Sequence, residues 1–227
     1  VAHERFGSIN IQTLFNYAID LARTGFPLTK EQANRLNYYK QDFIKYNHSN
    51  NYLQSDRWSA GDTLQQLDLA HTLTLIRDQG KEVFYEGEIA ESIVSSMGRQ
   101  GVITTDDLKN YQSIWRQPIN FNFGSYKLIS MPPPSSGGIA LSQLLMTLSN
   151  FQLDDIQHNS KEYIHLISEI EKLVYADRAT HLGDIDYYNV PINDLMNFKY
   201  NKGRSKLINK LRATPSDSIY SGDFNDK

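Results

Sequence analysis

Cysteine is absent from this sequence of 227 residues. The lack of thiols excludes disulfide bonds, zinc sites built on thiolates and a cysteine nucleophile. No apolar run reaches the ~18 residues that a membrane-spanning helix needs, and the start of the sequence lacks the charged and then apolar plan of a signal peptide. Because the sequence opens on Val1 and not on Met, we expect a processed product or a piece of a longer chain.

A large excess of charge of one sign is also lacking. The 23 Lys and Arg residues against 26 Asp and Glu residues leave a formal net charge of −3, and no basic block stands out. A nucleic-acid footprint needs a basic patch or stripe, so we expect no nucleic acid as a partner. Hydrophobic residues make up 40% and charged residues 22% of the sequence, which is the profile of a globular protein with one or two domains.

The first half of the sequence is predicted to be helical. Its apolar residues recur at intervals of three and four, and Gly, Ser, Thr or Asp residues mark most of the ends. The predicted helices cover residues 9–24, 29–46, 64–79, 88–97 and 104–111, and a turn is predicted at 84–87. The tripeptide Asn47-His48-Ser49 fits a glycosylation acceptor, but this pattern carries little weight without a secretory context.

The spacing of the apolar residues changes in the second half of the sequence. Residues 115–123 alternate in part, Gly124-Ser125 predicts a turn, and residues 126–131 predict a second strand, so we expect a β-hairpin. A long helix is predicted over 160–181, a short element from 190, and a polar helix over 200–211. The tail from residue 213 onward, rich in Ser, Asp and Gly, is expected to bury little.

The segment 131–139 (MPPPSSGGI) lies between the hairpin and an apolar-periodic helix. Three prolines predict an extended, polyproline-like stretch. Ser135 and Ser136 are suitable N-cap residues, and Gly137 and Gly138 let other atoms approach the backbone closely. The free N–H groups of the first helical turn could then receive an anionic ligand. A turn packed tightly against a neighbouring element needs the same residues, so both interpretations stay open here.

Two further groups of residues could carry chemistry. Glu162, His165 and Glu169 lie one helical turn apart from each other, but a carboxylate-bridged metal pair needs a second Glu-x-x-His, which the sequence lacks. We therefore expect no metal, and the absence of nucleotide-binding and G-x-S-x-G motifs predicts no cofactor. Asp177 and Arg178 are adjacent, so they point to different sides of a helix, and a structural ion-pair network is favoured over a catalytic one.

Several short runs, taken in their order and spacing, resemble the γ-glutamyltranspeptidase family along almost the whole chain. These runs are 2–7 (AHERFG), 25–26 (GF), 61–62 (GD), 69–73 (LAHTL), 84–90 (FYEGEIA), 106–111 (DDLKNY), 132–139 (PPPSSGGI), 175–178 (YADR), 182–184 (LGD) and 213–216 (ATPS). One departure is Ile185, where the family usually carries Pro.

The resemblance implies an α/β (α+β) fold, as the helix-rich large-subunit part of an αββα N-terminal-nucleophile hydrolase sandwich. Residues 1–227 would form a single large-subunit segment. Within it we expect a helical part at 1–111, strands plus helices at 112–211 and a tail at 212–227.

The resemblance also implies that the chemistry lies elsewhere. The family's precursor cuts itself, and the nucleophile is a Thr at the new N-terminus of the small subunit, which we expect after Lys227. No catalytic residue is then expected in this chain, and the vicinity of Ser135, Ser136, Gly137 and Gly138 is the one candidate for substrate contact. The implied partner is the small subunit, the implied substrates are γ-glutamyl amides such as glutathione, and the implied location is periplasmic or extracellular.

Alternatives remain at this point. Relatives of the family include cephalosporin acylases and poly-γ-glutamate depolymerases, and scaffold residues do not separate these activities. A degenerate module that binds γ-glutamyl compounds or a partner protein is a second alternative. An unrelated helix-rich α/β domain is disfavoured by the number of ordered segments that match.

Overall fold

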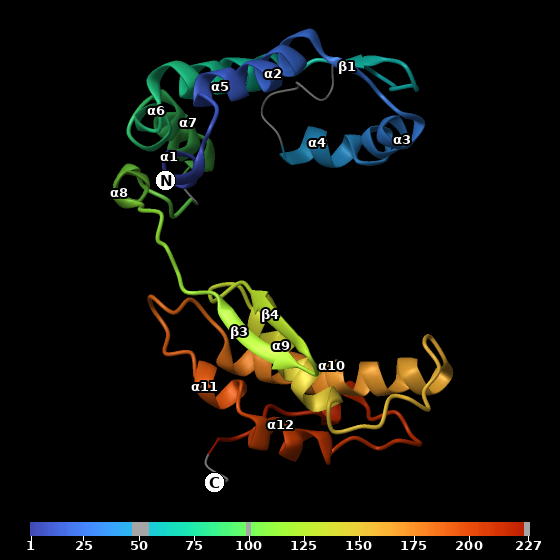
Figure 1. Cartoon of the computed structure of the whole chain (residues 1–227). Coiled ribbons are helices and arrows are strands. Elements are labelled where there is room, and N and C mark those ends of the chain that lie inside the picture. The colour runs from blue at the N-terminus through green and yellow to red at the C-terminus, as the bar shows by residue number, and fades with distance from the viewer. Residues whose placement is uncertain (47–54, 99–100, 225–227) are drawn as a thin grey trace. The chain divides into compact units, whose positions relative to one another are not determined.

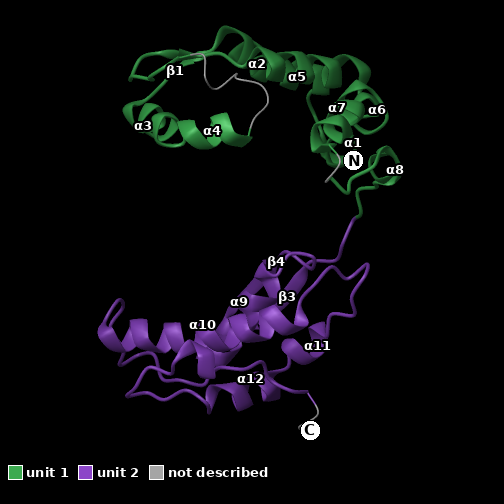
Figure 2. Cartoon of the chain, turned by 180° about the vertical axis from the view of Figure 1, so that it is seen from behind, with its two compact units in different colours: residues 1–114 green, residues 115–227 purple. Residues whose placement is uncertain are grey.

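The computed structural model describes residues 1–46, 55–98 and 101–224. The chain forms two compact units, Val1–Ile114 and Trp115–Lys227, which Figure 2 shows in green and purple. The predicted glycosylation acceptor at 47–49 lies outside the described residues. No described helix has the length and apolar character needed to cross a membrane.

Unit 1 consists of helices and one small antiparallel sheet. Its elements are α1 (Ala2–Phe6), α2 (Ile11–Thr24), β1 (Phe26–Pro27), α3 (Lys30–Tyr38), α4 (Lys40–Tyr46), β2 (Thr63–Leu64), α5 (Leu67–Gln79), α6 (Glu82–Tyr85), α7 (Glu88–Met97) and α8 (Thr105–Asn110). Helices α2 and α5 lie side by side (Figure 1), and β1 pairs with β2 so that Phe26 is opposite Leu64. A buried cluster gathers under β1, β2 and α3: Leu28, Ala33, Trp58 and Leu64.

Local signals placed most helix ends of unit 1 correctly. Thr29 and Thr104 each form a capping box with the residue three positions later, as their side-chain chemistry favours. Three predictions were wrong in detail. The helix expected over 29–46 is interrupted at Tyr39, residues 63–64 pair with β1 instead of starting a helix, and the turn expected at 84–87 is partly the helix α6.

Unit 2 is built on a β-hairpin and three longer helices. Its elements are β3 (Ile119–Phe123), β4 (Tyr126–Ser130), α9 (Gly137–Leu148), α10 (Lys161–His181), α11 (Ile192–Leu195), α12 (Phe198–Ser205) and the 3-10 helix η3 (Ser216–Ser218). The hairpin is antiparallel with Ile119 opposite Ser130, which confirms the predicted strands and turn.

The core of unit 2 lies around α9. The inward-facing Ile119 and Phe121 of β3 form a cluster with Ile139 of α9 and with Leu195. Helices α10 and α12 also pack on α9 (Figure 1), and Ile170 of α10 is fully buried in a second apolar cluster. Burial of such side chains stabilises a fold by roughly 1.5–3 kcal/mol each. The helix α9 is therefore the element on which the rest of the unit is assembled.

The structure corrects three predictions for unit 2. The segment 132–134 is not an extended polyproline stretch but a turn with a cis peptide bond between Pro133 and Pro134. The polar helix expected over 200–211 is α12, which ends at Ser205. The tail is not loosely attached, since Phe224 packs against the cluster that contains Ile119.

The described residues thus form a helix-rich α+β structure with two small sheets, which confirms the predicted class. The assignment of the whole chain to one large-subunit segment stays a prediction.

Candidate functional site

The start of α9 carries the predicted substrate-contact residues. Ser136 occupies the N-cap position, but its backbone is helical, and its side chain makes no capping hydrogen bond. An N-cap side chain reaches the first-turn N–H groups from an extended backbone, so Ser136 is the N-cap residue, as expected, but its side chain does not cap the helix. Ser135 Oγ instead accepts a long hydrogen bond of 3.4 Å from the Gly137 N–H.

The two glycines of this segment have different surroundings. A Cβ on Gly138 would lie 2.2 Å from the Met131 carbonyl oxygen and 3.3 Å from the Ile119 side chain. A Cβ on Gly137 would meet only Ser135 Oγ, at 3.6 Å. Gly138 is therefore needed for close packing of α9 against the hairpin, whereas Gly137 is exposed and open.

Arg178 joins the end of α10 to the start of α9. Its Nε donates a hydrogen bond of 2.9 Å to Ser136 Oγ, and its guanidinium lies 5.9 Å from the centre of the Tyr175 ring. A nucleophilic serine needs an adjacent base that accepts its proton. A guanidinium is always protonated and cannot serve as that base, so this contact positions Ser136 and does not activate it.

Asp177, the residue before Arg178, faces the interior. It is 1% exposed, and its Oδ1 lies 3.0 Å from Arg204 Nη2. Its Oδ2 accepts hydrogen bonds of 2.8 Å from Gln143 Nε2 and from the Tyr200 hydroxyl. Asp177 and Arg178 therefore have different partners on different sides of α10, as their adjacency predicts.

Burial and the nearby Asp177 carboxylate together determine the protonation state of Tyr200. Burial raises the pKa of the Tyr200 phenol above its ordinary value, and the Asp177 carboxylate adds to the rise. Tyr200 is thus a neutral hydrogen-bond donor and not a base. Two buried atoms of this network, Gln143 Oε1 and Arg204 Nε, have no partner within the described chain. The network orients α9, α10 and α12 on one another.

A second charged group lies on α10. Glu169 is 2% exposed and pairs with Lys172, and its Oε1 accepts a hydrogen bond of 3.1 Å from the Thr214 N–H. Burial alone would raise the pKa of Glu169, but the hydrogen bonds from Lys172 and Thr214 outweigh it, so its pKa is lowered. The carboxylate stays ionised and holds the chain at Thr214.

The structure does not bring the metal candidates together. His165 Nε2 lies 2.8 Å from the Asn209 carbonyl oxygen, while Glu169 is occupied by Lys172 and Thr214. Within residues 1–46, 55–98 and 101–224, no group of three His, Cys, Asp or Glu side chains could hold a metal ion.

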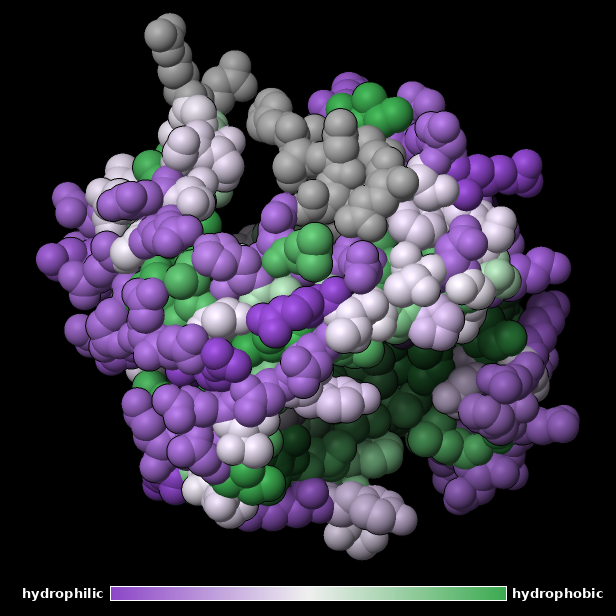
Figure 3. Space-filling model, turned by 90° about the horizontal axis from the view of Figure 1, so that it is seen from above, coloured by the Kyte–Doolittle hydropathy of each residue, from purple (hydrophilic) through white to green (hydrophobic). Residues whose placement is uncertain are grey.

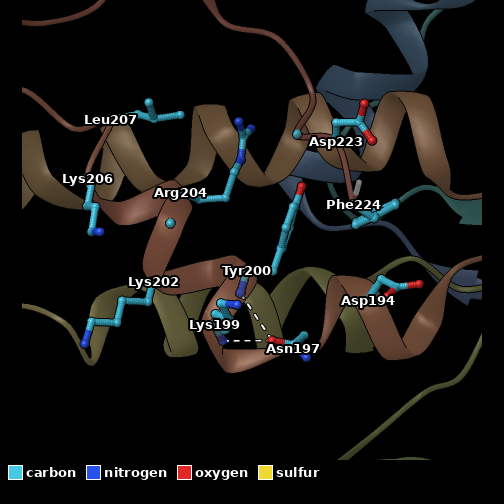
Figure 4. Close-up of a pocket in the computed structure, with 12 residues that line it drawn as sticks. Asp194, Asn197, Lys199, Tyr200, Lys202, Arg204, Lys206, Leu207, Asp223 and Phe224 are labelled. Atoms are coloured by element: carbon cyan, nitrogen blue, oxygen red, sulfur yellow. Dashed lines mark hydrogen bonds between the residues drawn. The ribbon is translucent and has the colours of Figure 1, made fainter. Parts of the chain in front are cut away.

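An open cavity of about 640 Å³ lies beside α12. Tyr200 and Arg204 extend from α12 toward the side on which Asp223 lies, and Lys202 points away from them (Figure 4). The polar ends of Tyr200 and Arg204 are engaged with Asp177 and so do not converge on this cavity.

Sequence reasoning missed Gln143, Tyr200 and Arg204 as partners of Asp177. They come from α9 and α12, 34 residues before and 23 and 27 residues after it along the chain. No local spacing connects positions this far apart. The burial of Asp177 requires a cation and hydrogen-bond donors close by, but this burial is visible only in the structure.

Comparison with known proteins gives a match over the whole chain. The family model described as gamma-glutamyltranspeptidase matches residues 1–227. The glutathione hydrolase proenzyme of Pseudomonas aeruginosa is 38% identical over 97% of this chain and 40% of its own length. The glutathione hydrolase proenzyme of Escherichia coli is 36% identical over 98% of this chain and 39% of its own length. The chain therefore spans about 40% of the length of these relatives.

Comparison of the fold with solved structures gives the same family. The crystal structure of Helicobacter pylori gamma-glutamyltranspeptidase superposes with a TM-score of 0.90 and 34% identity, covering 99% of this chain and 65% of that one. The start of α9, the Asp177 network and the whole element order lie inside the matched region. The chain belongs to the γ-glutamyltranspeptidase family.

Proposed function

We propose that this chain is the large-subunit scaffold of a γ-glutamyltranspeptidase. The complete enzyme would cleave γ-glutamyl amides such as glutathione and transfer the γ-glutamyl group to water or to an amino acid. The observation that carries the proposal is the family match over residues 1–227. The names of the relatives, which are glutathione hydrolase proenzymes, support it.

The proposed chemistry uses a threonine that lies outside this chain. Its hydroxyl attacks the γ-glutamyl carbonyl, and its own α-amine accepts the hydroxyl proton. The resulting ammonium group gives this proton to the leaving amine, which departs as the acyl-enzyme forms. Water or an acceptor amine then releases the γ-glutamyl group. The α-amine becomes available only after the precursor has been cut before this threonine, which is why cleavage must come first.

The partner in this proposal is a small subunit made from the same precursor. The start of α9, with Ser135, Ser136, Gly137 and Gly138, remains the proposed vicinity of substrate contact. Only Gly137 and the partly exposed serines are accessible there, because Gly138 is buried. A periplasmic or extracellular location is proposed from the family resemblance.

The test compares this chain with its complete proenzyme. We expect the purified chain to release no chromophore from a γ-glutamyl anilide, and the self-cleaved proenzyme to do so. A proenzyme with its threonine changed to Ala is the control, and it should neither cut itself nor turn over substrate. Turnover by residues 1–227 alone would overturn the scaffold proposal. Turnover of a cephalosporin side chain or of poly-γ-glutamate, in place of the anilide, would favour the related acylase or depolymerase activity.

A further inference from the structure

The C-terminal part of unit 2 lies along α10 and is held there through its main chain. We call residues 209–224 the strap. None of its residues is fully buried. Of its side chains, Phe224 is the one that packs against a described apolar cluster. The strap is therefore bound mainly by polar contacts.

The first half of the strap is bound by three side chains of α10. His165 Nε2 lies 2.8 Å from the Asn209 carbonyl oxygen, and Glu169 accepts the Thr214 N–H at 3.1 Å. Lys172 Nζ donates to the Thr214 carbonyl oxygen at 2.6 Å. The N–H and the C=O of Thr214 are thus both bonded to charged side chains.

The second half is bound in the same way. Asp177 accepts the Gly222 N–H at 2.9 Å, and His181 Nε2 lies 3.0 Å from the Gly222 carbonyl oxygen. Arg204, which is paired with Asp177, donates to the Tyr220 carbonyl oxygen at 2.9 Å. The buried ion pair of unit 2 is thereby the main anchor of the strap.

The anchors on α10 form two pairs. His165 and Glu169 are four residues apart, as are Asp177 and His181, so the two members of each pair are neighbours on the helix surface. Their partners at 209, 214 and 222 follow the same order along the chain. These hydrogen bonds go to backbone atoms of the strap, and the side chain of Phe224 adds an apolar contact at its end.

We propose that the strap is a latch that opens from α10 as one cooperative unit while α9, α10 and α12 stay folded. Segments with few buried apolar contacts open locally at lower free energy than the core of a protein. Hydrogen bonds to charged groups hold the strap closed, and the bonds at Thr214 and Gly222 support each other because they fix one continuous segment. Opening also moves Phe224 away from the apolar cluster that contains Ile119. This proposal does not depend on the proposed function.

Gly222 offers a variant that opens the latch and leaves the buried charges in place. A Cβ at this position would lie 2.2 Å from the Tyr200 hydroxyl, so Gly222→Ala pushes the strap away from Asp177. Gly203→Ala is the matched control, because a Cβ on Gly203 has no atom within 4 Å. Both are glycine-to-alanine changes in the same unit.

The experiment is hydrogen exchange under native conditions on the full chain, followed by mass spectrometry. We expect Gly222→Ala to speed exchange across the whole of residues 213–224 by about tenfold or more, since bonds to charged groups are lost. Exchange in α9 and α10 should stay unchanged, and Gly203→Ala should leave exchange at residues 213–224 at the wild-type rate. Faster exchange only beside residue 222, or equally faster exchange in α10, would overturn the proposal.

Lys172→Met tests the latch from its other end. This change removes the bond to the Thr214 carbonyl oxygen together with the ion pair to Glu169, which also binds Thr214, and it leaves Gly222 untouched. A cooperative latch predicts that exchange at residues 219–224 also rises, by the same factor as at 213–218. An effect confined to residues near Thr214 would show that the strap is a row of independent contacts, and the proposal would fail.

Discussion

At the residue scale, Asp177 orients three helices, and the loss of one of its partners would be costly in stability. A carboxylate without partners would be expelled from a protein interior because of its desolvation cost. Here Arg204 supplies the opposite charge, and Gln143, Tyr200 and the Gly222 N–H supply donors. Such a pair adds little net stability, but removing one partner leaves the other charge buried alone.

The variant Asp177→Asn tests this at the residue scale. We expect it to lower the free energy of unfolding by about 3–5 kcal/mol, because Arg204 then loses its counter-charge in a buried site. Denaturant unfolding followed by tryptophan fluorescence and circular dichroism measures the change.

Arg178→Ala is the neighbouring control. Arg178 is exposed, and its contacts are a hydrogen bond to Ser136 and a cation–π contact with the Tyr175 ring, so a loss of less than about 1 kcal/mol is expected. Equal losses for the two variants would contradict the assignment of Asp177 as the buried anchor.

Glu169 predicts a pH dependence. Its pKa is lowered in the folded state because the bonds from Lys172 and Thr214 outweigh burial. A lowered carboxyl pKa contributes stability that is fully present above the unfolded-state value and is lost as the pH falls through the folded-state value. We therefore expect the stability difference between the wild type and Glu169→Gln to be largest near neutral pH and to shrink in acid. Unfolding measured in denaturant at a series of pH values checks this, and a constant difference would contradict it.

At the scale of elements, the position of α9 depends on the packing of its first turn and not on a side-chain cap. The turn at Pro133–Pro134 ends β4 and brings Gly138 against the Met131 carbonyl oxygen. The helix then packs on the hairpin through Ile139 and on α10 and α12 through its other faces. The close approach at Gly138 therefore fixes how near the helix lies to the strands.

Glycine-to-alanine changes at the neighbouring positions 137 and 138 test the close contact between α9 and the hairpin. Gly138→Ala is expected to destabilise unit 2 by about 1–3 kcal/mol, because the new methyl group overpacks the contact with Met131 and Ile119. Gly137→Ala should change stability by less than about 1 kcal/mol, since its Cβ has open space and alanine favours helix.

Thermal unfolding of both variants is the measurement.

The same two variants also test whether substrate contacts the start of α9. If ligands contact the exposed backbone of Gly137, Gly137→Ala in the complete enzyme should raise KM without a loss of stability.

At the scale of the whole molecule, the chain consists of two units with their own cores. The cluster around Trp58 and Leu64 belongs to unit 1, and the clusters around Ile139 and Ile170 belong to unit 2. Exposed apolar side chains occur in many places, including Leu14 and Tyr17 on α2. Figure 3 shows hydrophobic residues in green among hydrophilic residues in purple on the face that it presents.

Because each unit has its own core, a substitution in the core of unit 2 is expected to change hydrogen exchange in unit 2 and not in unit 1. We expect Asp177→Asn to speed hydrogen exchange in α9, α10 and α12, where its partners lie, and to leave α2 and α5 at the wild-type rate. Exchange measured at a denaturant concentration below the unfolding transition gives the comparison. A uniform increase over both units would show that they unfold together.

The sequence by itself determined the local features of this protein. The capping boxes at Thr29 and Thr104, the hairpin around Gly124 and the ordered runs that identify the family all depend on neighbouring residues, so they can be read along the chain. The start of α5 and the end of α12 were misjudged because pairing with β1 and packing overrode local preference, and residues 132–134 form a turn where an extended stretch was expected.

Only the tertiary structure decided what Asp177 does and where the tail lies. Gln143, Tyr200, Arg204 and Gly222 are separated from Asp177 by 23 to 45 residues along the chain. The tail was expected to bury little, yet side chains of α10 and Arg204 of α12 hold its backbone in place. Hydrogen bonds to main-chain atoms leave no pattern in the sequence of the segment that is held, because every residue except proline offers the same N–H and C=O groups.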